Sequence, residues 1–190
     1  DYDDPDPAVL KANIEGTKEF ILLSHDIGAT GVKVKPNSFH EGVDRQKTIE
    51  QIGKSLNEVG KFAGDHGQQI RVEVHGSCCE LPTMKAIFDI ADNPNVAMCW
   101  NSNDQDLNGE GLDYNFNLVK DRFGATAHIR ELNVGDYPYQ QLMDNFVAMD
   151  YDGWVLLECR TKVEDGIKAM TEQRELFAQM IKNGQMKVKA

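Results

Sequence analysis

The sequence predicts an α/β fold of the (β/α)8-barrel type, represented by about five βα units of an N-terminally incomplete barrel. Two observations lead to this prediction. Strand patterns alternate with helix patterns along the chain, which is typical of parallel βα architecture. In addition, each strand pattern has apolar side chains on one face and polar side chains on the other.

The alternation runs from one end of the sequence to the other. Residues 7–27 have apolar side chains at helical spacing, and Gly28 and Gly31 separate them from the first strand. Asp44 precedes the next helix pattern, and Pro138 suits the first turn of a later one. The expected strands are 32–36, 70–76, 95–101, 126–132 and 153–159, and the expected helices are 7–27, 45–65, 81–92, 112–123, 138–149 and 164–183.

The polar strand faces favour a barrel over an open doubly wound sheet. Helices cover both faces of an open sheet, so both faces of its strands would be apolar. The segment IRVEVHG (residues 70–76) instead has three aliphatic side chains on one face and Arg71, Glu73 and His75 on the other. Polar groups of this kind suit a barrel interior that opens into a site at its C-terminal rim. The alternative is a polar face in solvent, which would leave a parallel sheet with one uncovered face.

Composition argues against several classes of protein. The chain has 190 residues, a formal net charge of −11 and a pI of about 4.8, which argues against a nucleic-acid partner. No apolar run approaches the roughly 20 residues of a membrane-spanning helix, so no membrane partner is expected. The opening DYDDPDP lacks signal-peptide features, which predicts a cytoplasmic protein unless an export signal has been removed. The four cysteines are too few and too irregular for a disulfide framework.

Four candidate metal ligands occupy corresponding positions near the carboxyl ends of four strands. They are Glu73, Asn101, His128 and Glu158, separated from one another by roughly 30 residues, about one βα unit. Two carboxylates, an imidazole and an amide oxygen suit Mn²⁺ or Mg²⁺, and Co²⁺ or Zn²⁺ less well. Each residue alone would be a weak signal, because single strand-end Glu and His residues are often ion-pair partners. The set in register is a stronger one.

Further polar residues on the same faces are candidate substrate contacts. Lys33 and Lys35 would present cations to an anionic or polyhydroxylated substrate, or they would charge an edge strand against aggregation. Arg130 and Arg160 each follow a candidate ligand by two residues and could hold a phosphate or pair with an acidic neighbour. The full set of candidate substrate contacts is Lys33, Lys35, His75, Asn103, Arg130 and Arg160.

The strand motifs resemble those of the xylose isomerase-like TIM barrels, which include sugar-phosphate isomerases, ketose 3-epimerases and an apurinic-site endonuclease branch. The resemblance covers about residues 8–182 and rests on IRVEVHG, CWNSN, AHIREL and GWVLLEC as strands five to eight. It implies a metal site formed by Glu73, Asn101, His128 and Glu158, with Glu73 and Glu158 also acting as catalytic acid and base. The family usually has Asp at the position of Asn101, so Asp104 is a candidate source of the missing charge.

The resemblance also implies that the first three of eight βα units are absent. Residues 1–182 are therefore expected to form a partial TIM-barrel domain with strands four to eight, and residues 183–190 a loose C-terminal tail. Both outer strands would then have unpaired backbone groups. We expect the chain alone to aggregate, to form a homo-oligomer or to belong to a longer polypeptide.

The function that the resemblance implies is that of a metal-dependent sugar or sugar-phosphate isomerase or epimerase. Its central step would be proton transfer next to a carbonyl through an enediolate, assisted by the cation. A lyase or dehydratase acting on a keto-sugar would begin in the same way, and a non-catalytic sugar-binding barrel is the alternative if no metal binds. A phosphodiester hydrolase is less consistent, because the sequence lacks a basic groove and additional zinc ligands.

Overall fold

The computed structural model describes residues 1–189 and contains five parallel βα units. The strands are β1 (Gly31–Val34), β2 (Gln69–Glu73), β3 (Val96–Cys99), β4 (Thr126–Ile129) and β5 (Trp154–Leu157). Each overlaps an expected strand. Each also ends two or three residues earlier than expected, because the chain leaves the hydrogen-bonded ladder to form the loops at the carboxyl ends of the strands.

The strands lie in one row in the order of the sequence. β1, β2 and β3 form one parallel ladder, and β4 and β5 form a second. The two ladders are joined where Asn101 bridges His128, and the backbone N–H of His128 donates to the carbonyl oxygen of Trp100 at 2.7 Å. Parallel strands direct their carboxyl ends toward the same edge, so side chains at those ends meet there.

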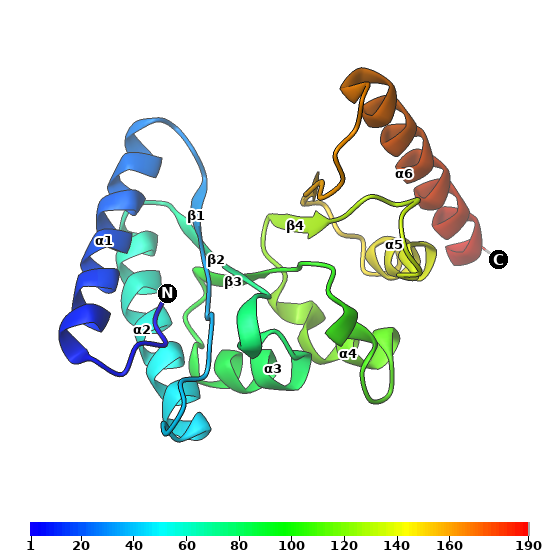
Figure 1. Ribbon diagram of the computed structural model, residues 1–190. Helices are drawn as coiled ribbons and strands as arrows, with labels where there is room; N and C mark the ends of the chain where they lie inside the picture. The colour runs from blue at the N-terminus through cyan, green and yellow to red at the C-terminus, as the bar shows by residue number, and fades with distance from the viewer. Residues whose placement is uncertain (190) are drawn as a thin grey trace.

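Helices follow the row of strands along its outer side and leave the other side without a helical layer, as Figure 1 shows. They are α1 (Pro7–Asp26), α2 (Arg45–Asp65), α3 (Leu81–Ile90), α4 (Leu112–Val119), α5 (Tyr139–Ala148) and α6 (Gly166–Val188). Short 3-10 segments follow β2, β3 and α4, at η1 (Gly76–Cys78), η2 (Asp104–Leu107) and η3 (Lys120–Arg122). No helix within residues 1–189 is long and apolar enough to span a membrane.

Aspartate side chains begin three of the helices. Asp6, Asp44 and Asp165 each accept a hydrogen bond from a backbone N–H in the first turn of α1, α2 and α6. The first N–H groups of a helix have no partner within the helix, so such caps stabilise it by about 1 kcal/mol. Pro138 is the residue immediately before α5, close to its expected place in the first turn.

The core lies between the helices and the apolar face of the strands, as the alternation predicts. Ile70 and Met98 are fully shielded from solvent. Trp100 lies on the same face and packs against Phe116 and Phe123, with ring centroids 5.5 and 5.7 Å away. Burial of such side chains contributes roughly 1.5–3 kcal/mol each. This layer attaches the strands to the helices and leaves the opposite face for polar groups.

The C-terminal segment differs from the expected loose tail. α6 continues to Val188, so residues 183–188 are helical and the prediction is wrong for them. Gly184 is buried against α5, and a Cβ at this position would lie only 3.1 Å from the side chain of Val147. The helix thus packs against α5 beyond residue 183, where the sequence predicted its end. Ala190 lies outside the described residues.

β1 and β5 are the outer strands of the row, and each has one edge without a strand partner in the described chain. On β5, Trp154 is 74% exposed and Leu156 is 41% exposed, and their alternation places them on the face opposite the core. A groove beside them is lined by Phe177 and Ile181 of α6. Apolar surface thus lies open at the edge where an incomplete barrel would expose it.

Candidate metal and substrate site

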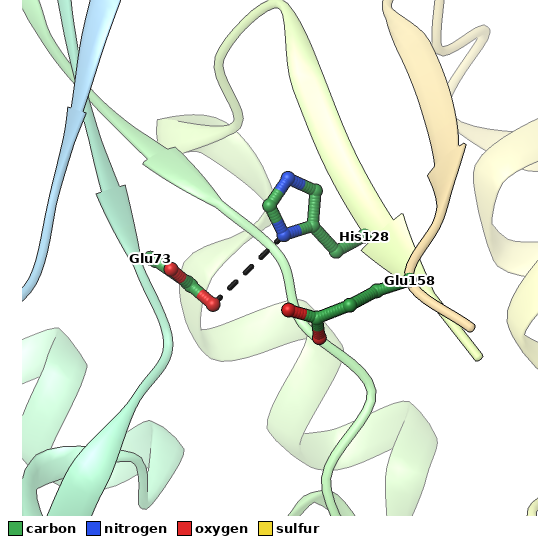
Figure 2. A group of neighbouring side chains, drawn as sticks. All are labelled: Glu73, His128 and Glu158. Carbon is green, nitrogen blue, oxygen red and sulfur yellow. Dashed lines mark ion pairs between the residues drawn. The ribbon is translucent and has the colours of Figure 1, made fainter. Parts of the chain in front are cut away.

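Four side chains meet at the carboxyl end of the strand row. Glu73 ends β2, Asn101 follows β3, His128 belongs to β4 and Glu158 follows β5. Ligand atoms of Glu73, His128 and Glu158 all lie within 4.8 Å of one another. Figure 2 shows these three side chains pointing into one space between the strands. Residues far apart in the sequence are thus brought together on the polar face.

Glu73 is the most enclosed of these residues, with 1% of its surface exposed. Its Oε1 accepts a hydrogen bond from Asn101 Nδ2 at 3.2 Å and lies 3.9 Å from His128 Nδ1. Its Oε2 forms an ion pair with Lys33 of β1. Burial alone would raise the pKa of Glu73, but the contacts with His128 and Lys33 outweigh burial and lower the pKa to about 2. Glu73 is therefore ionised near neutral pH.

His128 lies beside two groups that favour its protonated form. Interactions with Cys99 and then with Glu73 raise the pKa of His128 to about 10, against the opposing effect of partial burial. Cys99 belongs to β3 and is itself fully buried. A metal ion at the imidazole would therefore have to displace a proton from it.

Three polar atoms of the group are buried without a hydrogen-bond partner among the described residues. They are Asn101 Oδ1, His128 Nδ1 and Glu158 Oε2. Leaving such atoms unsatisfied costs about 1–3 kcal/mol each, so three together require an explanation. Asn101 Oδ1 and Glu158 Oε2 are suitable metal-ligand atoms as they stand, and His128 Nδ1 becomes one once its proton is displaced; with the Glu73 carboxylate they form a set of oxygen and imidazole donors. The residues present therefore fit a divalent cation.

The two lysines at β1 contact residues of β2. Lys33 pairs with Glu73, and Lys35 Nζ lies 3.4 Å from His75 Nε2. Burial and the neighbouring charge of Lys35 lower the pKa of His75, which keeps this imidazole neutral beside the ammonium group. Both lysines therefore belong to the polar face of the row and are not isolated charges on an edge strand.

The two candidate arginines lie on the other side of the cluster. Arg130 donates a hydrogen bond to Asn103 Oδ1 at 3.3 Å, and the Asn103 amide nitrogen donates to the carbonyl oxygen of Asn101 at 2.9 Å. A guanidinium nitrogen of Arg160 lies 3.8 Å from Glu158 Oε2. Both arginines are thus connected to candidate metal ligands, Arg130 through Asn103 and Arg160 directly.

Asp106 is a buried residue that the sequence interpretation missed. Its Oδ2 accepts hydrogen bonds from the backbone N–H of Asn103 at 2.9 Å and from the Tyr137 hydroxyl at 2.7 Å. Burial raises the pKa of Asp106 to about 7 in spite of these bonds. The Asn-x-x-Asp spacing of a capping box was the available signal. Asp104, proposed as a source of charge, is exposed on η2 and lies outside the cluster of ligand atoms.

Glu131 is the second carboxylate that the sequence interpretation did not single out. It follows β4, is 6% exposed and accepts hydrogen bonds from the segment after Glu158. From the sequence, Glu131 is only one of the acidic neighbours with which Arg130 or Arg160 could pair. Its role depends on a loop that is roughly 30 residues away, about one βα unit, and no local pattern indicates such a contact.

The model of the xylose isomerase-like TIM barrel family matches residues 1–180 of this chain. No curated protein matches it. The chain is similar to the structure of L-ribulose 3-epimerase, with 15% identity over 100% of this chain and 73% of that chain, and a TM-score of 0.87. It is also similar to apo 3-keto-D-glucoside 4-epimerase from E. coli, with 14% identity over 94% of this chain and 74% of that chain, and a TM-score of 0.80.

A third similar structure is a xylose isomerase-like TIM barrel protein from Mycobacterium smegmatis in complex with magnesium. The identity is 16% over 94% of this chain and 70% of that chain, and the TM-score is 0.66. The three comparisons confirm the expected fold class, with five βα units that agree with a partial barrel. At these identities they establish the fold and not a particular activity.

Proposed function

The chain belongs to the xylose isomerase-like TIM barrel family, and on this basis we propose that it is a divalent-metal-dependent isomerase or epimerase of a sugar or sugar phosphate. The observation that carries the proposal is the convergence of Glu73, His128 and Glu158, whose ligand atoms lie within 4.8 Å of one another. The two similar epimerase structures support the same reaction class at 14–15% identity.

We assign the metal to Glu73, Asn101, His128 and Glu158. Mn²⁺ or Mg²⁺ suits these donors best, with Co²⁺ or Zn²⁺ as alternatives. The magnesium complex of a relative at 16% identity supports a hard cation. When bound, the cation would supply positive charge opposite the substrate oxygens that become negative during proton removal.

Glu158 is the better candidate for removing the proton from the carbon next to the carbonyl. Its side chain is 42% exposed at the open face, where a substrate can approach it. Glu73 is enclosed and ion-paired with Lys33, which holds it as a weak base and suits it to the ligand role. The carbon-bound proton would pass to a carboxylate oxygen of Glu158, and the electron pair left behind would form the enediolate.

The return of the proton decides the product. Glu158 can return it to the neighbouring carbon, which gives isomerisation with one base. Return to the opposite face of the same carbon gives epimerisation and requires a second group, and Glu73 is the other carboxylate of the cluster. Glu73 would have to take up a proton for this role. Loss of a β-leaving group from the same enediolate would instead give a lyase.

The substrate contacts in this proposal are Lys33, Lys35, His75, Asn103, Arg130 and Arg160. Their cationic and hydrogen-bonding groups suit a polyhydroxylated molecule or its phosphate ester. Arg130 reaches the cluster through Asn103, and Lys35 lies beside His75, two residues after the assigned ligand Glu73. A sugar extending between them would lie with its carbonyl near Glu158.

The test combines analysis of bound metal with a measurement of proton exchange at the substrate carbon next to the carbonyl. Purified protein is assayed for bound metal, and a panel of ketoses and ketose phosphates is followed for solvent deuterium exchange at the carbon next to the carbonyl. Glu158→Gln should lower the exchange rate by about 10²–10⁴ while substrate still binds, because it removes the base. Glu164→Gln, an exposed glutamate before α6, is the matched control and should have no effect.

Two results would contradict the proposal. Exchange that survives both chelation and Glu158→Gln would mean that the chemistry lies elsewhere. Absence of exchange with every substrate, together with absence of bound metal, would favour a sugar-binding barrel without catalysis. Elimination products in place of isomers would identify the lyase.

A further inference from the structure

We propose that Glu131 is a positioning residue that holds the loop after β5, and with it Glu158, in the geometry of the site. This inference rests on the proposed function, because it explains how the base in that proposal is oriented. Glu131 is not one of the residues whose ligand atoms form the cluster. It acts through the backbone of the residues that follow Glu158.

One carboxylate oxygen of Glu131 receives every hydrogen bond of this contact. Oε1 accepts from the backbone N–H of Arg160 at 2.9 Å and from the backbone N–H of Thr161 at 2.6 Å. It also accepts from the Thr161 hydroxyl at 2.6 Å and from the Cys159 thiol at 3.1 Å. The four donors come from three consecutive residues, so the carboxylate organises the turn as a unit.

Hydrogen bonds hold the backbone both before and after the side chain of Glu158. On its amino side, its own N–H donates to the carbonyl oxygen of Ile129 at 2.7 Å, which is the last bond between β4 and the β5 chain. On its carboxyl side, the next three residues are held by Glu131. Both anchors come from the segment that ends β4, so Glu158 and His128 are positioned by the same stretch of chain.

The loop has little else to hold it. Residues 159–166 are all exposed, and Glu131 itself is buried at the end of β4. A loop of this kind would normally sample many conformations, and ordering it costs conformational entropy. Hydrogen bonds to an ionised acceptor are stronger than bonds between neutral groups and can offset this cost.

The negative charge of the Glu131 carboxylate strengthens its four hydrogen bonds to residues 159–161, which we call the clamp. Burial alone would raise the pKa of Glu131, but the bonds from Thr161 and Cys159 outweigh it and lower the pKa to about 2. Glutamine at this position retains an oxygen acceptor but loses the negative charge. Glu131→Gln is therefore a conservative variant that weakens the clamp without removing the side chain.

The expected result is loss of turnover with little change in substrate affinity. Misplacement of a catalytic group by about 1 Å can lower the rate on the order of 10²-fold, so Glu131→Gln should lower kcat by up to that factor. The affinity for Mn²⁺, measured by calorimetric titration in the absence of substrate, should decrease as well. Amide hydrogen exchange at Arg160 and Thr161 should accelerate. Glu164→Gln should change none of the three.

A double variant separates positioning from a general loss of stability. If Glu131 acts through Glu158, then Glu131→Gln should have almost no further effect on kcat in a Glu158→Gln background. If Glu131 only maintained overall stability, Glu131→Gln would lower kcat by the same factor in the wild-type and in the Glu158→Gln background. Thr161→Val, which removes only the hydroxyl donor, gives a milder form of the same test should Glu131→Gln fail to fold.

Two outcomes would overturn the inference. Unchanged amide exchange at Arg160 and Thr161 would show that Glu131 does not hold the loop. Faster exchange with unchanged metal affinity and unchanged kcat would show that the clamp does not serve the site. A wild-type protein that neither binds metal nor exchanges substrate protons refutes the proposed function instead, so the two failures are distinguishable.

Discussion

Asn101 donates a hydrogen bond from its Nδ2 to Oε1 of Glu73 at 3.2 Å, while its side-chain oxygen Oδ1 is buried without a partner among the described residues. The amide therefore satisfies one carboxylate and directs an unused acceptor into the same enclosed region. An aspartate here would present two acceptors and no donor. The amide thus holds Glu73 in place and carries one negative charge fewer than an aspartate would.

Asn101→Asp should tighten divalent-metal binding if the side chain is a ligand. The added charge strengthens attraction to the cation, and we expect a gain of about tenfold, equivalent to roughly 1.4 kcal/mol. Without metal the variant should be less stable than the wild type, because two carboxylates would face each other. Calorimetric titration with Mn²⁺ and melting with and without metal measure both effects. Asn117→Asp, at an exposed position of α4, carries the same charge change as a control, and equal affinities in the two variants would exclude Asn101 as a ligand.

Lys33→Met should have opposite effects on the free and the metal-bound protein. Loss of the ammonium leaves the buried Glu73 carboxylate with fewer partners, which should lower the free energy of unfolding by about 1–3 kcal/mol. It also removes a cation that competes for that carboxylate, so metal affinity should increase. Denaturant unfolding with and without Mn²⁺ provides the readout. Lys61→Met, a lysine on exposed surface of α2, should leave both quantities unchanged. A Lys33 variant that loses metal affinity would instead make Lys33 part of the support for the ligands.

Asp106 makes stability depend on pH near neutrality. An unfolded aspartate ionises at about pH 4, whereas burial keeps Asp106 protonated up to about pH 7 in the folded state. Between these values the folded state binds a proton that the unfolded state does not, so the free energy of unfolding decreases as the pH rises. Asp106→Asn keeps a neutral side chain, and its stability should decrease less between about pH 5 and about pH 8.

Urea unfolding of both proteins across this range tests the Asp106 prediction. Asp121→Asn, on exposed η3, is the control and should retain the wild-type pH dependence. Parallel curves for the wild type and Asp106→Asn would show that Asp106 does not titrate in this range.

The open edge of β5 should make the isolated chain associate. Trp154 and Leu156 are exposed beside unpaired strand backbone, and such edges pair readily with another chain. We expect sedimentation to show dimers or larger species, and Trp154→Lys with Leu156→Lys should shift them toward monomer. A monodisperse wild-type monomer of 21.3 kDa with cooperative melting would contradict this prediction.

The sequence alone determined which face of each strand enters the core. Side chains alternate between the two faces of a strand. Because the aliphatic neighbours of Glu73 and His128 enter the core, these two residues must lie on the opposite face. Because parallel strands end at one edge, it also follows that residues at equivalent strand ends approach one another. These rules are local or depend only on strand direction, so they required no knowledge of contacts between loops.

The tertiary structure decided the features that depend on particular loops. The contact of Glu131 with Arg160 and Thr161, the burial of Asp106 beneath Tyr137 and the extension of α6 along α5 each join segments roughly 30 or more residues apart, the length of one βα unit or more. No periodicity links such positions. The geometry of these contacts depends on how each loop packs against the next. Only this packing buries the carboxylates of Glu131 and Asp106 and places hydrogen-bond donors beside them.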